Sequence, residues 1–442
     1  MKAIVRLVLS LALVVLPGVF TPPAIGAAED AMVRPGPAGE RDANNPGALP
    51  SVSLNALIEE ALSRNPQIQA AQDNAEAKRY KVQPAGTLPG PTVSFQTMGN
   101  IIPPTLQSGD PSSGRYYGIE QEIPFPGKLG LKKKMATQEA DAGQWTAEQV
   151  RCQVIADLKA AYYDLWFVYK SIEVVEKDKK LLQDVVKTAE ARYRVGGGNQ
   201  SDVMRVQVEL SKLFDRLAVL EQRKGLSEAQ INNFLFRQDE TPLGKPEDFE
   251  KSPMKYSLDQ LLQMAKASSP RLKAQEKEIQ RSEYAVRLAE KEYYPDFAVG
   301  FTYVERERQP EMYSLMVKAR LPLYYRSSQR NELNASRKSL SGAKKQRDGM
   351  ASGIGYEVRN AYIVASTADR LVTLYGSNLI PQAKLALESA FASHHVGSVE
   401  FQALLESLVT LLDYELKYYE SLADYQKMLA QLEPIVGVEL TR

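Results

Sequence analysis

The chain is a tandem duplication of itself, and this feature limits its possible folds more than any other. The segment SLNALIEEALSRNPQIQAAQ, which begins at residue 53, aligns with SLDQLLQMAKASSPRLKAQE, which begins at residue 257. Further pairs keep the same order along the chain: Pro91 and Pro295, Pro124 and Pro322, Ala161 and Ala361, Val195 and Val396. A period this long excludes the short-repeat solenoids. The alignment predicts two copies of one unit, residues 53–240 and 257–437, with a linker at 241–256 and a short tail at 438–442.

Each copy is expected to contain a helix of some 35 residues, a strand pair, a very long helix, a glycine-containing turn and another helix. The first copy has no proline between Pro126 and Pro242, and residues 128–195 keep a helical pattern throughout. Within that run a heptad-like seam, typical of coiled coils, is formed by Leu158, Ala161, Leu165, Val168, Ile172 and Val175. In the second copy Pro381 predicts a kink or a helix break. The predicted fold class is mostly α with a small β part, built on long antiparallel coiled coils.

The segments that precede the long helices alternate between apolar and polar residues, as strands do. In DFAVGFTYVE, one face carries Phe297, Val299, Phe301 and Tyr303. Strands of about 9–11 residues suit an outer-membrane barrel, although a soluble two-layer sheet with one wet face explains the alternation equally well. Four strands cannot stand alone in lipid, because their edges would leave backbone groups unpaired. In the membrane interpretation, three copies of the chain would therefore close a barrel of twelve strands.

The N-terminus predicts export from the cytoplasm. Residues 1–28 have the order of a secretory signal peptide: Lys2 and Arg6, then an apolar run, then small residues. A retained membrane anchor is the alternative, but a Pro-Gly pair inside the apolar run disfavours it. Residues 29–52 are polar and rich in proline, glycine and alanine, and are expected to be flexible. The single cysteine, Cys152, excludes an intramolecular disulfide, so packing or assembly must hold the exported chain together.

The duplicated layout and four motifs resemble the outer-membrane efflux protein family, the TolC-like factors. The motifs are EIPFPGK and RLPLYYR at the strand-to-helix junctions, and RYRVGGGNQSDV and HHVGSVEF at the helix tips. The resemblance covers about residues 53–437. It implies a homotrimer with a twelve-stranded β-barrel in the outer membrane of a Gram-negative cell and a helical α-barrel through the periplasm. It also implies that this duct docks onto a periplasmic adaptor, or membrane fusion protein, and an inner-membrane pump.

The resemblance assigns roles to residues at the helix tips. Family tips carry Val-Gly followed closely by Ser or Thr, and these residues meet the adaptor. The matching residues here are Val195, Gly196, Ser201, Val396, Gly397 and Ser398. The first tip departs from the pattern by its extra glycines. Glu406 falls where family members often have an acidic residue that gates the entrance, whereas Ala403 occupies another position that is often acidic.

Charged residues are also expected around the barrel. The repeat alignment matches Glu120 with Lys318 and Glu122 with Arg320, which predicts that opposite charges meet on the lumenal face. If they are exposed to water, such pairs contribute little to stability. Near the junction with the periplasm, a basic collar close to the lipid is predicted from Lys128, Lys132, Lys133 and Lys134.

The sequence gives no convincing pattern for catalysis, cofactors or nucleic acid. His394 and His395 are the only histidines, and adjacent residues on a helix point in different directions, so two polar tip residues explain them better than a metal site. GGGNQS follows a helix and lacks the Lys-Ser/Thr ending of a phosphate loop. Two functions from different classes remain: a passive export duct, and a coiled-coil structural protein of the periplasm with no pore. The strand alternation and the duplication favour the duct, with multidrug, metal-ion and protein export open as its cargo.

Overall fold

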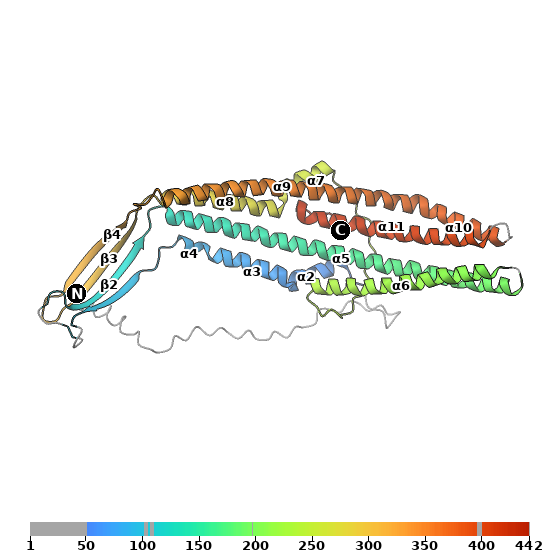
Figure 1. Ribbon diagram of the computed structural model, residues 1–442, viewed down its shortest axis with the longest axis horizontal. Coiled ribbons are helices and arrows are strands. Elements are labelled where there is room, and N and C mark those ends of the chain that lie inside the picture. Colours follow the sequence, from blue (N-terminus) through green and yellow to red (C-terminus); the bar gives the residue numbers. More distant parts are fainter. Residues whose placement is uncertain (1–50, 101–104, 107–109, 197, 396–399, 442) are drawn as a thin grey trace. The chain divides into compact units, whose positions relative to one another are not determined.

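The computed structural model describes residues 51–441 apart from 101–104, 107–109, 197 and 396–399. The first repeat supplies α2 (Leu54–Arg64), α3 (Pro66–Tyr80), α4 (Val82–Gly86), β1 (Thr92–Met98), β2 (Gly114–Ile123), α5 (Lys128–Arg194) and α6 (Gln200–Phe234). The second supplies α7 (Leu258–Ser268), α8 (Pro270–Lys291), β3 (Asp296–Glu305), β4 (Met312–Arg320), α9 (Gln329–Leu374), the π-helical turn η1 (Tyr375–Leu379), α10 (Ile380–His395) and α11 (Phe401–Val436). The described chain is therefore mostly helical with one small sheet, as predicted (Figure 1).

Each repeat opens with separate helices, so the expectation of one opening helix of some 35 residues is wrong. The break lies at Asn65 in the first repeat and at Ser269 in the second, and both residues have ψ near 120°. Each precedes a proline, whose ring disfavours the helical conformation of the preceding residue. Asn65 also begins the next helix, because its side-chain oxygen accepts hydrogen bonds from the backbone N–H groups of Gln67 and Ile68.

The long proline-free run forms one continuous helix, α5, of 67 residues. At 1.5 Å per residue its length is roughly 100 Å. The predicted seam lies inside the protein: Leu158, Leu165 and Val175 are buried. The buried surface is wider than that seam, because α5 packs against α3, α6, α8 and α11. A helix with this many neighbours buries more than the two positions per heptad of a simple coiled coil.

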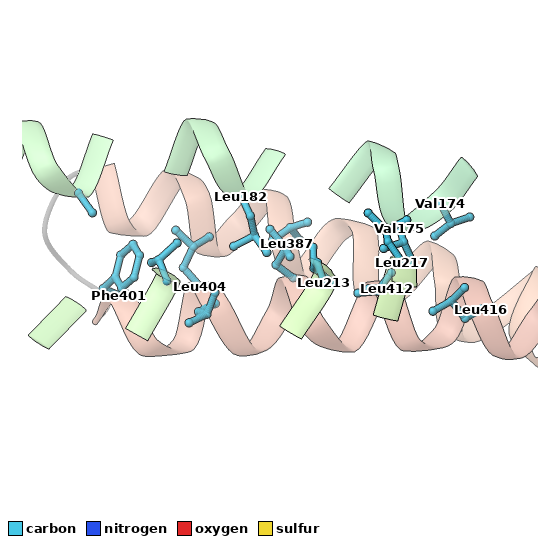
Figure 2. Close-up of a cluster of buried hydrophobic side chains, with 14 of the residues drawn as sticks. Val174, Val175, Leu182, Leu213, Leu217, Leu387, Phe401, Leu404, Leu412 and Leu416 are labelled. Atoms are coloured by element: carbon cyan, nitrogen blue, oxygen red, sulfur yellow. The ribbon is translucent and has the colours of Figure 1, made fainter. Parts of the chain in front are cut away.

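One hydrophobic cluster joins the two repeats toward the helix tips. Figure 2 shows its leucine and valine side chains meeting between α5 and α6 of the first repeat and α10 and α11 of the second. Its labelled members are Val174, Val175, Leu182, Leu213, Leu217, Leu387, Phe401, Leu404, Leu412 and Leu416. The two helical hairpins therefore share one core and do not fold as independent coiled coils.

The predicted interruption at Pro381 takes the form of a widened turn. Helix α9 ends at Leu374, the π-helical turn η1 follows, and α10 continues from Ile380. A regular α-helix would need the N–H of residue 381 to donate to the carbonyl of Ser377, and proline has no N–H. The wider turn directly before Pro381 accommodates this missing bond without ending the helix.

The sheet contains the four strands in sequence order, and every neighbouring pair is antiparallel. The β2–β3 pair joins the two repeats, with Ile119 opposite Phe301. Figure 1 shows β2, β3 and β4 side by side. Strands β1 and β4 are the two edges of this sheet. Within the residues that the structure covers, no helix has the length and apolar character required to cross a bilayer.

Candidate functional site

The sheet presents one continuous apolar face. Across the four strands, Val93 lies opposite Ile119, Ile119 opposite Phe301, and Phe301 opposite Leu315. All four side chains are exposed. A second row of aromatic residues follows, with ring centroids 5.3 Å apart for Phe95 and Tyr117, and 6.4 Å apart for Tyr117 and Tyr303. Exposed apolar patches that span several strands mark contact with a membrane or with another protein.

The opposite face of the sheet carries the predicted charge pairs. The Lys318 ammonium lies 2.6 Å from Glu120, and the Arg320 guanidinium lies 3.1 Å from Glu122. The structure therefore confirms that these opposite charges meet, through diagonal contacts from β4 across β3 to β2. Because all four side chains are accessible to solvent, each pair contributes at most about 1 kcal/mol. These pairs make this face of the sheet polar, but they stabilise the sheet little.

Where β2 ends and α5 begins, the buried Lys128 of the first repeat forms ion pairs with the second repeat. Lys128 is only 2% exposed, and its ammonium lies 2.9 Å from both Glu292 and Asp296. Burial opposes the charge of Lys128, but its hydrogen bonds to the two carboxylates outweigh that effect and raise its pKa. The Phe125 ring stacks on Tyr294 with centroids 4.6 Å apart, and the Phe125 N–H donates to Asp296.

The inclusion of Lys128 in an exposed basic collar is therefore wrong. Its side chain turns inward because two carboxylates from the second repeat receive it. The other three lysines of the predicted collar, Lys132, Lys133 and Lys134, are exposed. The sequence pattern did not separate the first lysine from the others, since its partners lie far away in the chain.

The first tip turn has the geometry that its glycine predicts. Gly196 has φ of 77°, a left-handed conformation that glycine adopts readily after the last residues of a helix. Val195 beside it and Ser201, in the first turn of α6, are exposed. The second predicted tip, 396–398, lies outside the described residues. It is bounded by the end of α10 and the start of α11.

The helices next to the two tips touch each other inside one chain. Arg192 at the end of α5 lies 2.6 Å from His394 at the end of α10, and the His394 ring packs edge-on against Phe401 at 5.5 Å. These three residues help to line a cleft of about 220 Å³, with Asp184 and Asp202 on its first-repeat side. Among the described residues, no group of three or more His, Cys, Asp or Glu is placed to hold a metal ion. His394 thus takes part in a contact between the hairpins.

Glu406 lies about two turns into α11, on an exposed part of the helix. Its carboxylate accepts a hydrogen bond of 2.9 Å from Gln402, one turn closer to the tip. Gln402 in turn accepts a hydrogen bond from Arg205 of α6. Glu406 is therefore close to the tip, and its carboxylate is exposed to solvent in the single chain. Its gating role stays a prediction.

The helical core also contains two acidic residues that the sequence analysis did not single out. Asp178 of α5 and Glu415 of α11 are both buried. Burial and then the negative charge of Glu415 raise the pKa of Asp178 from its ordinary 3.8 to about 6. Lys177 and Lys384 approach Glu415 at 3.6 and 3.5 Å. Asp178 lies one residue before position 179, where the seam of α5 continues, so the seam pattern did not single it out.

Replacing Asp178 with asparagine is expected to stabilise the protein at neutral and higher pH. Because the folded pKa exceeds the unfolded one, ionising Asp178 costs stability. This cost is absent below about pH 4, grows as the pH rises toward about 6 and is complete above it. At pH 8, Asp178→Asn should add about 3 kcal/mol to the free energy of unfolding, because each unit of the pKa difference corresponds to about 1.4 kcal/mol. At pH 4 it should add at most about 0.5 kcal/mol. Denaturant unfolding at the two pH values measures this, with the exposed Asp184→Asn as control; a loss of stability at pH 8 would contradict it.

Comparison with known proteins agrees with this geometry. The sequence profile of the family described as outer membrane efflux protein matches residues 57–235 and 261–438. No curated protein sequence gives a significant match. Among solved structures, the outer membrane protein VceC of Vibrio cholerae is similar, with 16% identity, a TM-score of 0.72, and coverage of 88% of this chain and 96% of VceC.

Two further structures are similar over nearly the same length. The open-state MtrE outer membrane channel of Neisseria gonorrhoeae has 16% identity and a TM-score of 0.73, covering 88% of this chain and 90% of its own. A membrane protein of Pseudomonas aeruginosa has 15% identity and a TM-score of 0.76, covering 87% and 90%. At such identities these structures establish the fold, and the profile match over both repeats establishes the family. The chain belongs to the outer membrane efflux protein family: it is a protein of the outer membrane with a role in efflux, and not an enzyme.

Proposed function

We propose that three copies of this chain form a passive duct that carries the substrate of a partner pump from the periplasm to the exterior. The observation that carries this proposal is the four-stranded sheet with one exposed apolar face and two open edges, β1 and β4. In lipid, every unpaired backbone group at such an edge would cost several kcal/mol, so the edges must pair with other copies. A closed antiparallel ring with lipid outside and polar residues inside satisfies both requirements.

Exposed apolar side chains on the helices support assembly of the same copies below the sheet. On α6 they are Met204, Val208, Val219 and Leu226, and on α9 and α10 they are Tyr356, Ile363 and Leu385. Isolated exposed apolar residues are ordinary, but these recur along helices that face no partner within the chain on that side. A structural coiled-coil protein without a pore would use such helix surfaces too. It would have no use for the apolar face of the sheet, so the duct is favoured.

In this proposal the charged face of the sheet lines the lumen, and its charges set ion selectivity. Replacing Lys318 with glutamate would leave three acidic residues and only Arg320 in this group, a change of two negative charges per chain. The expected result is a shift of the channel toward cation selectivity. The measurement is the reversal potential in a planar bilayer under a salt gradient, with the exposed helix variant Lys187→Glu as control. An unchanged reversal potential would show that this face does not line the pore.

The tips are the proposed contact with a periplasmic adaptor. Support comes from the exposed Val195 beside the left-handed Gly196, which together present a small apolar surface at the end of a helical hairpin. Val195→Asp is expected to weaken adaptor binding at least tenfold and to reduce efflux, while the trimer still forms. Binding of the detergent-purified protein to its adaptor measures the effect, and Lys187→Glu on the exposed side of α5 is the control. Equal binding by Val195→Asp and the unmodified protein would remove this tip from the docking surface.

The energy for transport would come from the pump. The glycine-rich first tip lacks the Lys-Ser/Thr ending of a phosphate loop, so it offers no nucleotide-binding motif. The proposed duct itself needs only to open and close. Glu406, close to the tip and accessible, is the proposed gating residue at the periplasmic entrance.

A further inference from the structure

The two repeats use the same junction differently, and the difference points to a specific contact between copies. The segment after β2, Pro124–Lys128, docks inside the chain onto the segment before β3, Glu292–Asp296. This contact consists of the Phe125–Tyr294 stack, the Phe125 N–H bond to Asp296 and the buried Lys128 ammonium. It holds the first repeat to the second at the point where strands become helices.

The repeat alignment gives the corresponding segments in the other half of each copy. Pro322 corresponds to Pro124, so Leu323 stands in the place of Phe125 and Arg326 in the place of Lys128. Pro91 corresponds to Pro295, so Gly90 stands in the place of Tyr294. By the same alignment, Leu88 stands in the place of Glu292 and Thr92 in the place of Asp296. The two carboxylates that bind Lys128 therefore have no acidic counterpart in the first repeat.

Among the described residues, no hydrogen bond, ion pair or ring contact joins these corresponding segments, and β1 and β4, which they flank, are opposite edges of the sheet. Both segments are open to solvent. Leu323 is 74% exposed, Tyr324 is 81% exposed and Leu88 is 52% exposed. The first segment follows the edge strand β4 and the second precedes the edge strand β1. In a closed ring the β4 edge of one copy meets the β1 edge of the next, just as β2 meets β3 inside a copy. The two exposed segments would then face each other across the boundary between copies.

We propose that Leu321–Arg326 of one copy docks onto Leu88–Thr92 of a second copy, in the way that Pro124–Lys128 docks onto Glu292–Asp296 within the chain. This inference rests on the proposed trimeric duct and names the surface that closes it. The contact between copies is apolar, since Leu323 replaces Phe125 and Leu88 replaces the acidic Glu292. The contact within a copy combines an aromatic stack with ion pairs around the buried Lys128. Burying leucine side chains on assembly stabilises the contact by about 25 cal/mol per Å² of apolar surface removed from water. Such a contact needs no oppositely charged residue from the second copy.

The helices next to the junction support the same partner. Helix α5 packs against both α3 and α8, whereas α9, its counterpart, packs against α8 and makes no comparable contact with α3. Tyr80, at the end of α3, is exposed, while its counterpart Tyr284 on α8 lies under the Lys134 ammonium of α5 at 5.7 Å. If α3 of a second copy packed against the open side of α9, then α9 would lie between α8 and an α3, as α5 does inside the chain.

Cysteine cross-linking tests this contact directly, because Cys152 is the only native cysteine. The test uses a Cys152→Ser background with the double substitution Leu323→Cys and Gly90→Cys. These two positions correspond to Phe125 and Tyr294, which stack within the chain. A side chain added at Gly90 meets open space. Mild oxidation of the detergent-purified protein should give covalent species of two and three chains on a denaturing gel without reductant. Each single cysteine variant should remain a single chain. The matched pair Phe125→Cys and Tyr294→Cys should cross-link only within one chain.

The outcomes separate this inference from the function on which it rests. Cross-linked trimers support both. A protein whose mass in detergent is that of a trimer, but whose Leu323→Cys and Gly90→Cys pair gives only single chains, overturns the docking contact and leaves the duct intact. In that case the exposed leucine and tyrosines of this segment contact lipid instead. A protein that is monomeric in detergent overturns both.

Discussion

Replacing Glu433 with alanine is expected to destabilise the protein by about 3 kcal/mol, the lower end of the usual cost of breaking a buried ion pair, because the exposed Glu439 stays 3.4 Å from the Lys159 ammonium. The Lys159 ammonium of α5 lies 2.8 Å from Glu433 of α11 and 2.9 Å from the Thr441 hydroxyl. Glu433 also accepts the backbone N–H groups of Leu440 and Thr441, so it holds the C-terminal segment against both helices. Lys159 is buried and the Glu433 side chain is only 10% exposed, so water replaces the lost carboxylate poorly.

The guanidinium midpoint of the detergent-purified protein measures this effect. The control is Lys187→Ala, which breaks the pair with Asp184, since both of these side chains are more than 70% exposed. Exposed pairs contribute at most about 1 kcal/mol, so the control should shift the midpoint little. Equal shifts for Glu433→Ala and the control would mean that the Lys159 site is open to water and holds nothing together.

Replacing Phe301 with lysine is expected to cost about 2–4 kcal/mol of folding stability in a bilayer, because a charge near the middle of a lipid-facing strand must leave water. Phe301 lies near the centre of β3 on the apolar face. The variant should accumulate poorly as folded protein in the outer membrane. Refolding into phospholipid vesicles, followed by the change in gel mobility on heating, gives the folded fraction.

Thr302→Lys is the matched control, since Thr302 is the next residue and its side chain points to the opposite face. Thr302 lies opposite Gly118 and Ser314, on the polar side of the sheet. This variant should fold normally and change conductance instead. If Thr302→Lys is the variant that fails to fold and Phe301→Lys folds, the assignment of the two faces is reversed.

Features that depend on local periodicity could be predicted from the sequence. The extent of α5 was predicted to within one residue of its observed end, because a proline-free helical pattern needs no information about distant neighbours. The charge pairs of Lys318 with Glu120 and Arg320 with Glu122 followed from the repeat alignment, which placed them at equivalent positions. Periodicity and duplication together therefore defined most of the fold.

The features that could not be predicted depend on partners far apart in the chain. Lys128 looked like the first lysine of an exposed run, and only the folded β2–β3 pair brings Glu292 and Asp296 to it. Lys159 likewise has its partners near the C-terminus. The break at Asn65 differs from these, because the following proline was a local signal that the prediction of one long opening helix did not use.

The central claim, that copies of this chain close into a trimeric duct, is tested most directly by the mass of the detergent-purified protein. Light scattering, corrected for bound detergent, should give about three times the mass of one chain. A monomer that is stable in buffer without detergent would contradict the account, because the apolar face of the sheet and its open edges could not then be exposed to lipid.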